Sequence, residues 1–422
     1  MKQLFICSML VSILFFETNA QEKYKTGINS NLIHTLQVKV SGSMISVPII
    51  KLDGDGQIEI NFDAIGHNYN RFVYSVTHCN ADWSQSALAP IEYLDGFQGL
   101  TIDDFATSVN TTTQYTNYIL QLPNEDVRFK VSGNYAVQVC LENEPHKVLF
   151  TACFSIEEPL ITIDAGITGN TMTDFNHEHQ QINFTIHHKS MPITYPQSDL
   201  KLFVYQNNRR DNVVTNLKPT TILRDQLVYD NNRDLIFEAG NEYRRMEFLS
   251  NRYNGMGVNS IQFYNPYYHI ELMTDRPRNN QPYVYDQDQN GRYFIRCSNC
   301  SDPDTEADYY IVHFALACEP FLDGSVYLNG DFFNNVLDER SKMGYNFETG
   351  RYEKSILLKQ GSYNYQYTFS GNGTSMGQPG VIEGNYYQVE NEYSIYVYYR
   401  PMGIRYDRLI GTAVIKNAMN LF

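Results

Sequence analysis

The sequence predicts an all-β protein built from three consecutive immunoglobulin-like or β-sandwich domains. Its last third alternates with a period of two, as antiparallel strands do. In one predicted strand, a single face comprises Tyr310, Val312, Phe314 and Leu316. In another, a single face comprises Tyr363, Tyr365, Tyr367 and Phe369. The 422 residues include 33 tyrosines and 24 phenylalanines, residue types that favour strands, and no long helical periodicity occurs. Domains of this type serve contact more often than chemistry.

The first twenty residues have the pattern of a signal peptide. Lys2 supplies the charged start, residues 4–16 form an apolar stretch, and residues 18–20 are small residues before a cleavage site. The apolar stretch is shorter than the ~20 residues that a spanning helix needs. We therefore expect a mature chain that begins at Gln21, is exported, and meets a membrane only through a partner.

Length and charge set further bounds. The mature chain is long enough for two to four domains at about 100–200 residues each. Its net charge of −15 argues against nucleic acid as a partner, because phosphate binding needs a basic surface.

The first domain is expected over residues 21–158. Its strands are predicted at residues 36–40, 57–62, 71–78, 133–141 and 148–156. Residues 157–159 (EEP) form a natural junction, since two charges precede a proline that cannot join a strand ladder.

The middle domain is expected over residues 159–301, and the C-terminal domain over residues 302–422. Middle-domain strands are predicted at residues 161–163, 181–187, 200–206, 260–263, 269–273, 283–285 and 293–296. Residues 302–304 (DPD) mark the second junction. The last domain is expected to close with strands at residues 393–399 and 409–415.

Six cysteines follow the signal peptide, in a compartment where disulfides persist. Cys140 and Cys153 flank a predicted hairpin, and placing them opposite each other predicts a cross-strand disulfide. Cys297 and Cys300 form a CxxC motif without further zinc ligands nearby, which favours a local disulfide over a metal or redox site. Cys79 and Cys318 are expected to be free.

Metal-binding patterns are weak. Residues 286–291 (DQDQNG) open like a calcium loop, but Cys297 stands where the bidentate glutamate is needed, so a turn between two strands is the preferred interpretation. Residues 53–56 (DGDG) are interpreted as a hairpin turn. His177, His179, His187 and His188 are interpreted as ordinary strand histidines. We predict no metal site, no cofactor and no catalytic residue, since no HExxH or GxSxG motif occurs.

Aromatic residues are the better candidates for function. Tyrosine is enriched at interface hot spots because it offers a large, rigid and amphipathic surface. The candidate interface aromatics are Tyr267, Tyr268, Tyr386, Tyr387, Tyr398 and Tyr399. The only tryptophan, Trp83, follows a predicted strand and is interpreted as a core anchor.

Several long motifs occur together in one order. They are residues 74–83 (YSVTHCNADW), 200–212 (LKLFVYQNNRRDN), 217–230 (LKPTTILRDQLVYD), 238–244 (EAGNEYR) and 392–411 (EYSIYVYYRPMGIRYDRLIG). With them the chain resembles the plug protein family of the type IX secretion system over nearly its whole mature length.

This resemblance implies a non-enzymatic role in protein secretion. Members of the family bind the periplasmic side of a very wide outer-membrane translocon barrel and close it when the channel is idle. The resemblance thus implies a periplasmic location, peripheral to the outer membrane, with the barrel as partner. It carries over no residue-level sites.

The C-terminal domain also resembles early-set immunoglobulin-like domains that accompany starch- and glycogen-active enzymes. Residues 324–332 (GSVYLNGDF) and 350–367 carry this likeness. A polysaccharide-binding module is therefore the alternative function. Those modules stack sugars on exposed tryptophans, however, and this domain contains none, so the likeness speaks for the fold rather than for sugar binding.

Overall fold

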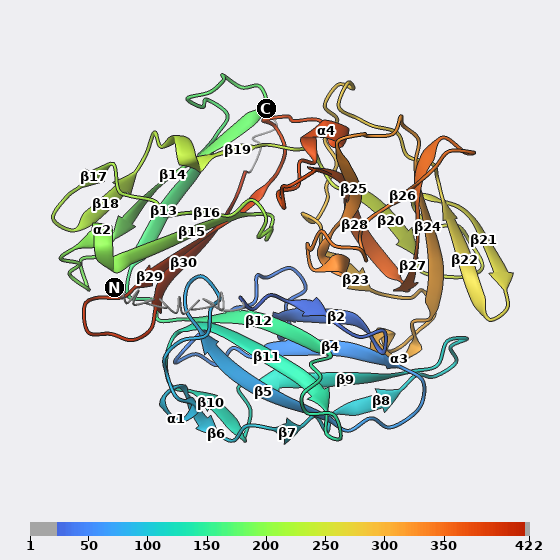
Figure 1. Ribbon diagram of the computed structural model, residues 1–422, viewed down its shortest axis with the longest axis horizontal. Helices are drawn as coiled ribbons and strands as arrows, with labels where there is room; N and C mark the ends of the chain where they lie inside the picture. The colour runs from blue at the N-terminus through green and yellow to red at the C-terminus, as the bar shows by residue number, and fades with distance from the viewer. Residues whose placement is uncertain (1–22, 418–422) are drawn as a thin grey trace, which may run out of the picture.

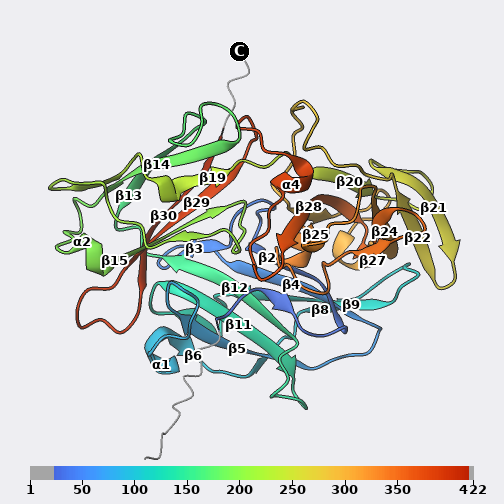
Figure 2. The same ribbon diagram turned by 45° about the horizontal axis from the view of Figure 1, so that its top comes forward.

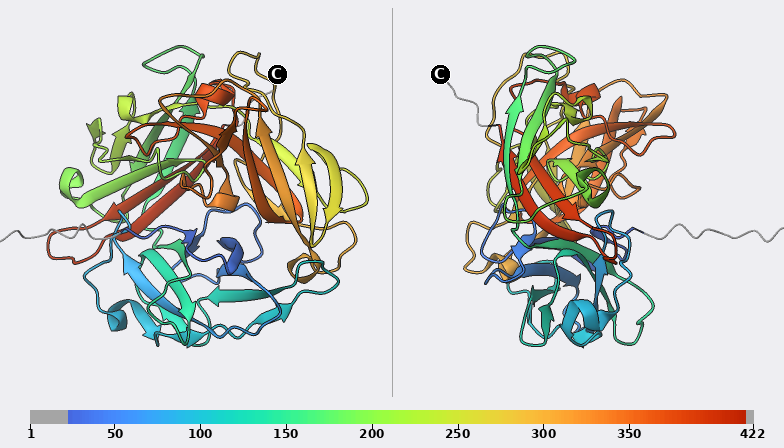
Figure 3. Two further views of the ribbon diagram at one scale, coloured as in Figure 1. Left: turned by 45° about the vertical axis from the view of Figure 1, so that its right-hand side comes forward. Right: turned by 90° about the vertical axis from the view of Figure 1, so that its left-hand side faces the viewer.

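The structure, a computed structural model, describes residues 23–417 and has the expected all-β class. The predicted signal peptide, residues 1–20, lies outside the described residues. The sheets, in which most strand pairs are antiparallel, are packed in three lobes that surround a common centre (Figure 1). Seen from the side, the body is flatter than it is wide (Figure 3). No helix within residues 23–417 has the length and apolarity needed to cross a membrane.

The first lobe is a sandwich of two sheets. One sheet has the order β1-β12-β11-β5-β7, with β3 beside β12, and the other has the order β2-β4-β9-β8. Their bounds are β1 Gly27–Ile28, β2 Ile33–Val40, β3 Ile49–Lys51, β4 Ile58–Ile65, β5 Phe72–Cys79, β7 Leu100–Thr101, β8 Phe105–Thr107, β9 Tyr115–Leu122, β11 Gly133–Leu141 and β12 Phe150–Glu157. A short helix and a ribbon flank them, namely α1 Pro90–Tyr93, β6 Leu94–Gly96 and β10 Val127–Phe129.

The second lobe combines two distant parts of the chain. Its outer sheet has the order β13-β14-β18-β17, with β19 beside β14, and its inner sheet has the order β16-β15-β29-β30. The bounds are β13 Thr162–Thr168, β14 His179–His187, α2 Pro196–Asp199, β15 Leu200–Gln206, β16 Val214–Thr215, β17 Thr221–Ile222, β18 Gln226–Tyr229, η1 Arg233–Leu235, β19 Ile236–Glu238, β29 Glu392–Tyr399 and β30 Arg408–Lys416.

The third lobe lies between these two parts in the chain. A sheet ordered β21-β22-β24-β27-β26 packs on one ordered β20-β28-β23, in which β25 also pairs with β28. The bounds are β20 Arg244–Phe248, β21 Val258–Tyr264, β22 Tyr267–Leu272, β23 Tyr293–Ile295, α3 Pro303–Glu306, β24 Tyr309–Leu316, β25 Gly324–Asn329, η2 Asp331–Phe333, β26 Gly344–Asn346, β27 Arg351–Lys359, β28 Gly361–Gly371 and α4 Gly380–Glu383.

These pairings contradict the expected boundary between the middle and C-terminal domains. Strand β29 pairs along its length with β15, from Leu200 opposite Tyr399 to Gln206 opposite Tyr393. Both strands contribute to one hydrophobic core, while β20 to β28 enclose another. The boundary at 301/302 falls inside the third lobe, because the apolar faces that seal each core come from segments far apart in sequence.

We therefore propose a different domain division. In this division the first domain covers residues 23–158 and keeps the end proposed from the sequence. The second covers residues 159–241 together with 387–417, and the third, residues 242–386, is inserted into it. Figure 2 shows the red strands β29 and β30 beside the green β13 to β15, away from the orange third lobe.

Candidate functional site

The first and third lobes are joined by a buried ion pair. The Lys359 ammonium on β27 lies 2.7 Å from the Asp63 carboxylate on β4, and both side chains are 1% exposed. The Tyr309 hydroxyl donates to the same carboxylate at 2.6 Å, and the ammonium lies 4.1 Å from the centre of the Tyr115 ring. Removing two charges from water is costly unless their partners are fixed in place, so this contact holds the lobes in one arrangement.

Buried polar contacts also join the other lobes. The Tyr398 hydroxyl of the second lobe donates to the Asn134 side-chain oxygen of the first at 2.8 Å. The Arg292 guanidinium of the third lobe lies 2.5 Å from the Glu392 carboxylate of the second, with side-chain exposures of 10% and 3%. Every pair of lobes therefore shares desolvated polar contacts, which makes the three lobes one rigid body.

A cavity of about 360 Å³ lies where the three lobes meet. Trp83 lines it from the first lobe, Arg210 from the second, and Asp331 from the third. The Arg210 guanidinium lies 4.1 Å from the centre of the Trp83 ring. Burial raises the pKa of Asp331 to about 6, although the charge of Arg292 opposes this. The cavity is thus a mixed polar and aromatic junction.

The cavity also contains the thiol of Cys153. Burial raises the pKa of this thiol, and the nearby Arg210 charge only partly offsets that effect. A nucleophilic cysteine needs a lowered pKa, since the thiolate is the reactive form. Cys153 therefore has the properties of a structural cysteine.

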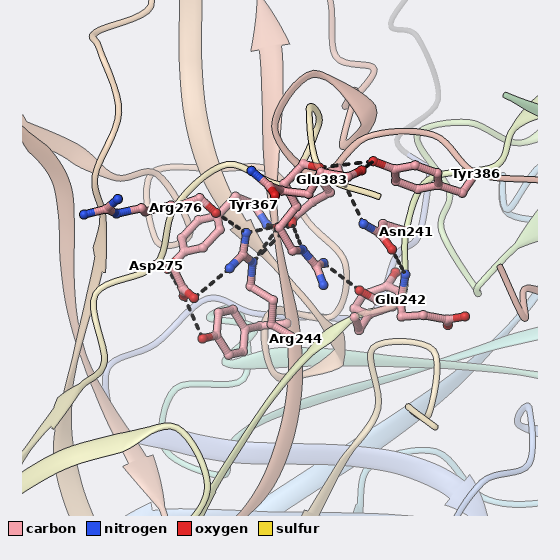
Figure 4. A network of polar contacts seen from close by, with 12 residues as sticks. Asn241, Glu242, Arg244, Asp275, Arg276, Tyr367, Glu383 and Tyr386 are labelled. Carbon is pink, nitrogen blue, oxygen red and sulfur yellow. Dashed lines mark hydrogen bonds and ion pairs between the residues drawn. The ribbon is translucent and has the colours of Figure 1, made fainter. Parts of the chain in front are cut away.

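A network of buried charges organises the third lobe (Figure 4). The Arg244 guanidinium on β20 donates to the Glu383 carboxylate at the end of α4 and lies 2.7 Å from Asp275. Glu383 is fully buried and also pairs with Arg278 at 2.8 Å. The Tyr367 hydroxyl donates to Asp275 at 2.8 Å. We call these five residues the Arg244 network.

A second buried carboxyl, Glu242, lies where the chain passes from the second lobe into the third. It is 1% exposed and accepts a hydrogen bond from the Tyr283 hydroxyl at 2.5 Å, while its Oε2 has no partner among the described residues. Burial raises the pKa of Glu242 to about 7. Burial also raises the pKa of nearby Asp288 to about 6.

The raised pKa of Glu242 predicts a loss of stability as pH rises. An unfolded glutamate ionises near pH 4.3, so the folded state binds the extra proton between that pH and about 7. The free energy of unfolding should fall across this window by on the order of 3–4 kcal/mol. We expect Glu242→Gln to flatten the dependence in urea titrations at pH 5, 6, 7 and 8. The control is Glu238→Gln, at an exposed carboxyl; a wild-type slope in the Glu242 variant would contradict this assignment.

The cysteines follow the prediction only in part. Cys297 and Cys300 form a disulfide, whereas Cys140 and Cys153 are free thiols, so the predicted cross-strand disulfide is wrong. Between β11 and β12, Cys153 lies opposite Ala136, and Val139 lies opposite Phe150. The strands are thus shifted by four residues from the predicted register, so that Val139 pairs with Phe150 instead of Phe154. Cys79 and Cys318 are also free.

The candidate interface tyrosines separate into two groups. Tyr398 is 1% exposed and belongs to the contact between the first and second lobes, so its prediction as a surface residue is wrong. The other five are partly exposed, namely Tyr267, Tyr268, Tyr386, Tyr387 and Tyr399. Of these, Tyr386 is held by its hydroxyl, which donates to the backbone oxygen of Arg278 at 3.1 Å.

The weak metal patterns are engaged in other contacts. Asp286 pairs with Arg245 at 2.5 Å, and residues 283–285 form no strand, so the predicted hairpin around this turn is wrong. His179 and His187 lie 2.8 Å from Asp174 and Asp164 respectively. Within the described part of the chain, no three histidine, cysteine or acidic side chains gather as metal ligands would.

Sequence reasoning missed the buried charges that join the lobes. The local pattern gave little signal, since Asp63 takes a polar position of the alternating strand IEINFDAI, and only Lys359 directly follows an apolar run, ILL. A charge inside such a strand is rarely buried without a partner. What the sequence did not show was the partner, 296 residues away.

These features define the class of protein. The chain is a rigid, multi-lobed β-sandwich body whose buried ion pairs either join the lobes or organise the third lobe internally. Residues 33–158 match the family described as "Type 9 secretion system plug protein 1st domain", and the chain belongs to the plug protein family of the type IX secretion system. Its role is therefore in type IX secretion.

A solved structure is similar to nearly the whole chain. The crystal structure of a hypothetical protein from Parabacteroides merdae is similar with 67% sequence identity and a TM-score of 0.94. The similarity covers 94% of this chain and 100% of the other. No curated protein matches the chain.

Proposed function

We propose that this protein is a non-enzymatic periplasmic plug, which binds and closes the periplasmic side of the outer-membrane type IX translocon barrel. The family match over residues 33–158 carries this proposal. The rigid body supports it, because a pore that passes folded proteins needs a cover that does not deform. Buried ion pairs such as Lys359 with Asp63 provide that rigidity. The protein would reach the membrane only through its partner.

Partly exposed tyrosines supply candidate contacts for this role. Tyr267, Tyr268, Tyr386, Tyr387 and Tyr399 retain exposed surface and are of the type found at interface hot spots. The polysaccharide-binding alternative has less support, because the only tryptophan, Trp83, lines the central cavity beneath Arg210. Blank glycan arrays with the purified protein would remove that alternative.

Affinity capture tests the proposed function directly. Tagged protein expressed in its own cells and captured from mild detergent extracts of the envelope should recover the large translocon barrel. Deletion of the gene should leave the outer membrane permeable to large antibiotics, and re-expression of the wild-type chain should restore the barrier. Captures that never contain the barrel would refute the proposal.

A further inference from the structure

A row of aromatic rings runs from the core of the third lobe to the exposed end of one hairpin. It begins at Tyr293 and ends at Phe263 on β21, and neighbouring ring centres are 4.9–5.9 Å apart. In order, the rings belong to Tyr293, Tyr363, Phe248, Tyr310, Tyr268 and Phe263. Tyr363 is 1% exposed, but Phe263 is 51% exposed. The row of aromatic rings thus continues from the core of the third lobe, between its two sheets, to the exposed end of the β21–β22 hairpin.

The two faces of this hairpin differ in character. On the core-facing side, Ile261 lies opposite Ile270, and Phe263 lies opposite Tyr268. On the other side, Tyr264 contacts His269, which stacks on His313 with ring centres 5.2 Å apart. We call Ile261, Phe263 and Tyr268 the inner face of the hairpin. It is apolar, whereas the outer face is polar and built around histidines.

The hairpin also lies at the edge of its sheet. Strand β21 ends the sheet order β21-β22-β24-β27-β26, and the hairpin occupies the periphery of the third lobe, far from the centre (Figures 1 and 2). Exposed edge strands in soluble proteins commonly carry lysine or proline against unwanted pairing. Residues 258–264 (VNSIQFY) contain neither. An edge of this kind is suited to being covered by a partner.

Charge indicates what that partner surface is like. The chain has a net charge of −15, yet residues 258–268 contain no aspartate, glutamate, lysine or arginine. Interface cores are depleted in charge and enriched in aromatic residues. A partner that meets this hairpin therefore presents an uncharged, apolar surface, and the acidic remainder of the body does not compete for that contact.

We propose that the inner face of the β21–β22 hairpin docks on an uncharged apolar groove at the periplasmic rim of the translocon barrel. This inference rests on the proposed function and adds the surface that performs it. Phe263 is the anchor, because the ring row behind it holds it in a fixed position. Preorganised aromatic anchors are the usual source of interface affinity.

Site-specific photocrosslinking in living cells tests the contact. A benzophenone-bearing phenylalanine analogue is placed at position 263, or at the matched control position 264 on the opposite face. Position 263 should crosslink to the barrel at least several-fold more than position 264. In parallel, Phe263→Ser should lower recovery of the barrel by on the order of tenfold or more, whereas Tyr264→Ser should retain it. The melting temperatures of both variants should match that of the wild type.

The possible outcomes distinguish a failure of the proposed docking surface from a failure of the proposed plug function. If the wild type recovers the barrel but positions 263 and 264 crosslink equally, the docking surface is wrong and the plug function stands. Crosslinks from position 263 to a second copy of this chain would also overturn the inference, by making the hairpin a self-association surface. If the wild type recovers no barrel, the proposed function itself fails.

Discussion

Replacing Lys359 with methionine is expected to lower the free energy of unfolding by about 3–5 kcal/mol. The substitution leaves the Asp63 carboxylate, which is 1% exposed, without its counter-charge. The Tyr309 hydroxyl and the Asn117 amide, which donates at 2.8 Å, remain as neutral partners. Neutral donors compensate a buried charge only in part, so most of the free-energy cost of desolvating the Asp63 carboxylate remains. Guanidinium denaturation followed by circular dichroism measures the loss.

Two further variants make this prediction specific. Lys354→Met on the same strand is the control, because the Lys354 ammonium is partly exposed and contacts a backbone oxygen at 3.2 Å; its effect should stay below about 1 kcal/mol. The double variant Asp63→Asn with Lys359→Met should lose less than the sum of the two single losses, because neither charge is then stranded. Additive losses would show that the pair is not coupled.

The strands of the first lobe were predictable because local alternation determines them. Segments near residues 57–62, 71–78 and 133–141 were placed within a few residues of the strands observed. Strand β9 was missed, although YTNYILQL at residues 115–122 forms the centre of a sheet. Its apolar residues do not alternate cleanly, because seven of the eight side chains are buried or nearly so. Period-two patterns fail where both faces of a strand are covered.

The pairing of strands that are far apart in the sequence could not be predicted. Nothing local in LKLFVYQ indicates that its partner is β29, nearly two hundred residues later. The same limit hid the role of Tyr398, whose exposed or buried state depends on a contact with Asn134 of another lobe. The resemblance of several separate motifs to one family was more informative about the function. A family likeness indicates that the whole fold is shared, although it does not say which strands pair.

The second large effect is expected at Arg244, where methionine should cost about 3–5 kcal/mol. Arg244 is 10% exposed at its side chain and pairs with Glu383 and Asp275. Without Arg244, the buried Glu383 carboxylate keeps only one charged partner, Arg278. Asp275 keeps only neutral partners, two tyrosine hydroxyls. The adjacent Arg245→Met is a matched control, because its pair with Asp286 has exposures of 34% and 43% and surface pairs contribute at most about 1 kcal/mol.

The pH dependence of this loss identifies the Arg244 network as its cause. Burial alone would raise the pKa of Glu383, but the charges of Arg244 and Arg278 outweigh it and hold the pKa below its ordinary value. A lowered folded pKa contributes stability that is present above the unfolded value near 4.3 and is lost as pH falls through the folded value. The stability gap between the wild type and Arg244→Met should therefore remain constant from pH 7 to 5 and narrow below about pH 4 in urea titrations. A gap that stays constant in acid would place the loss in packing around the Arg244 side chain instead.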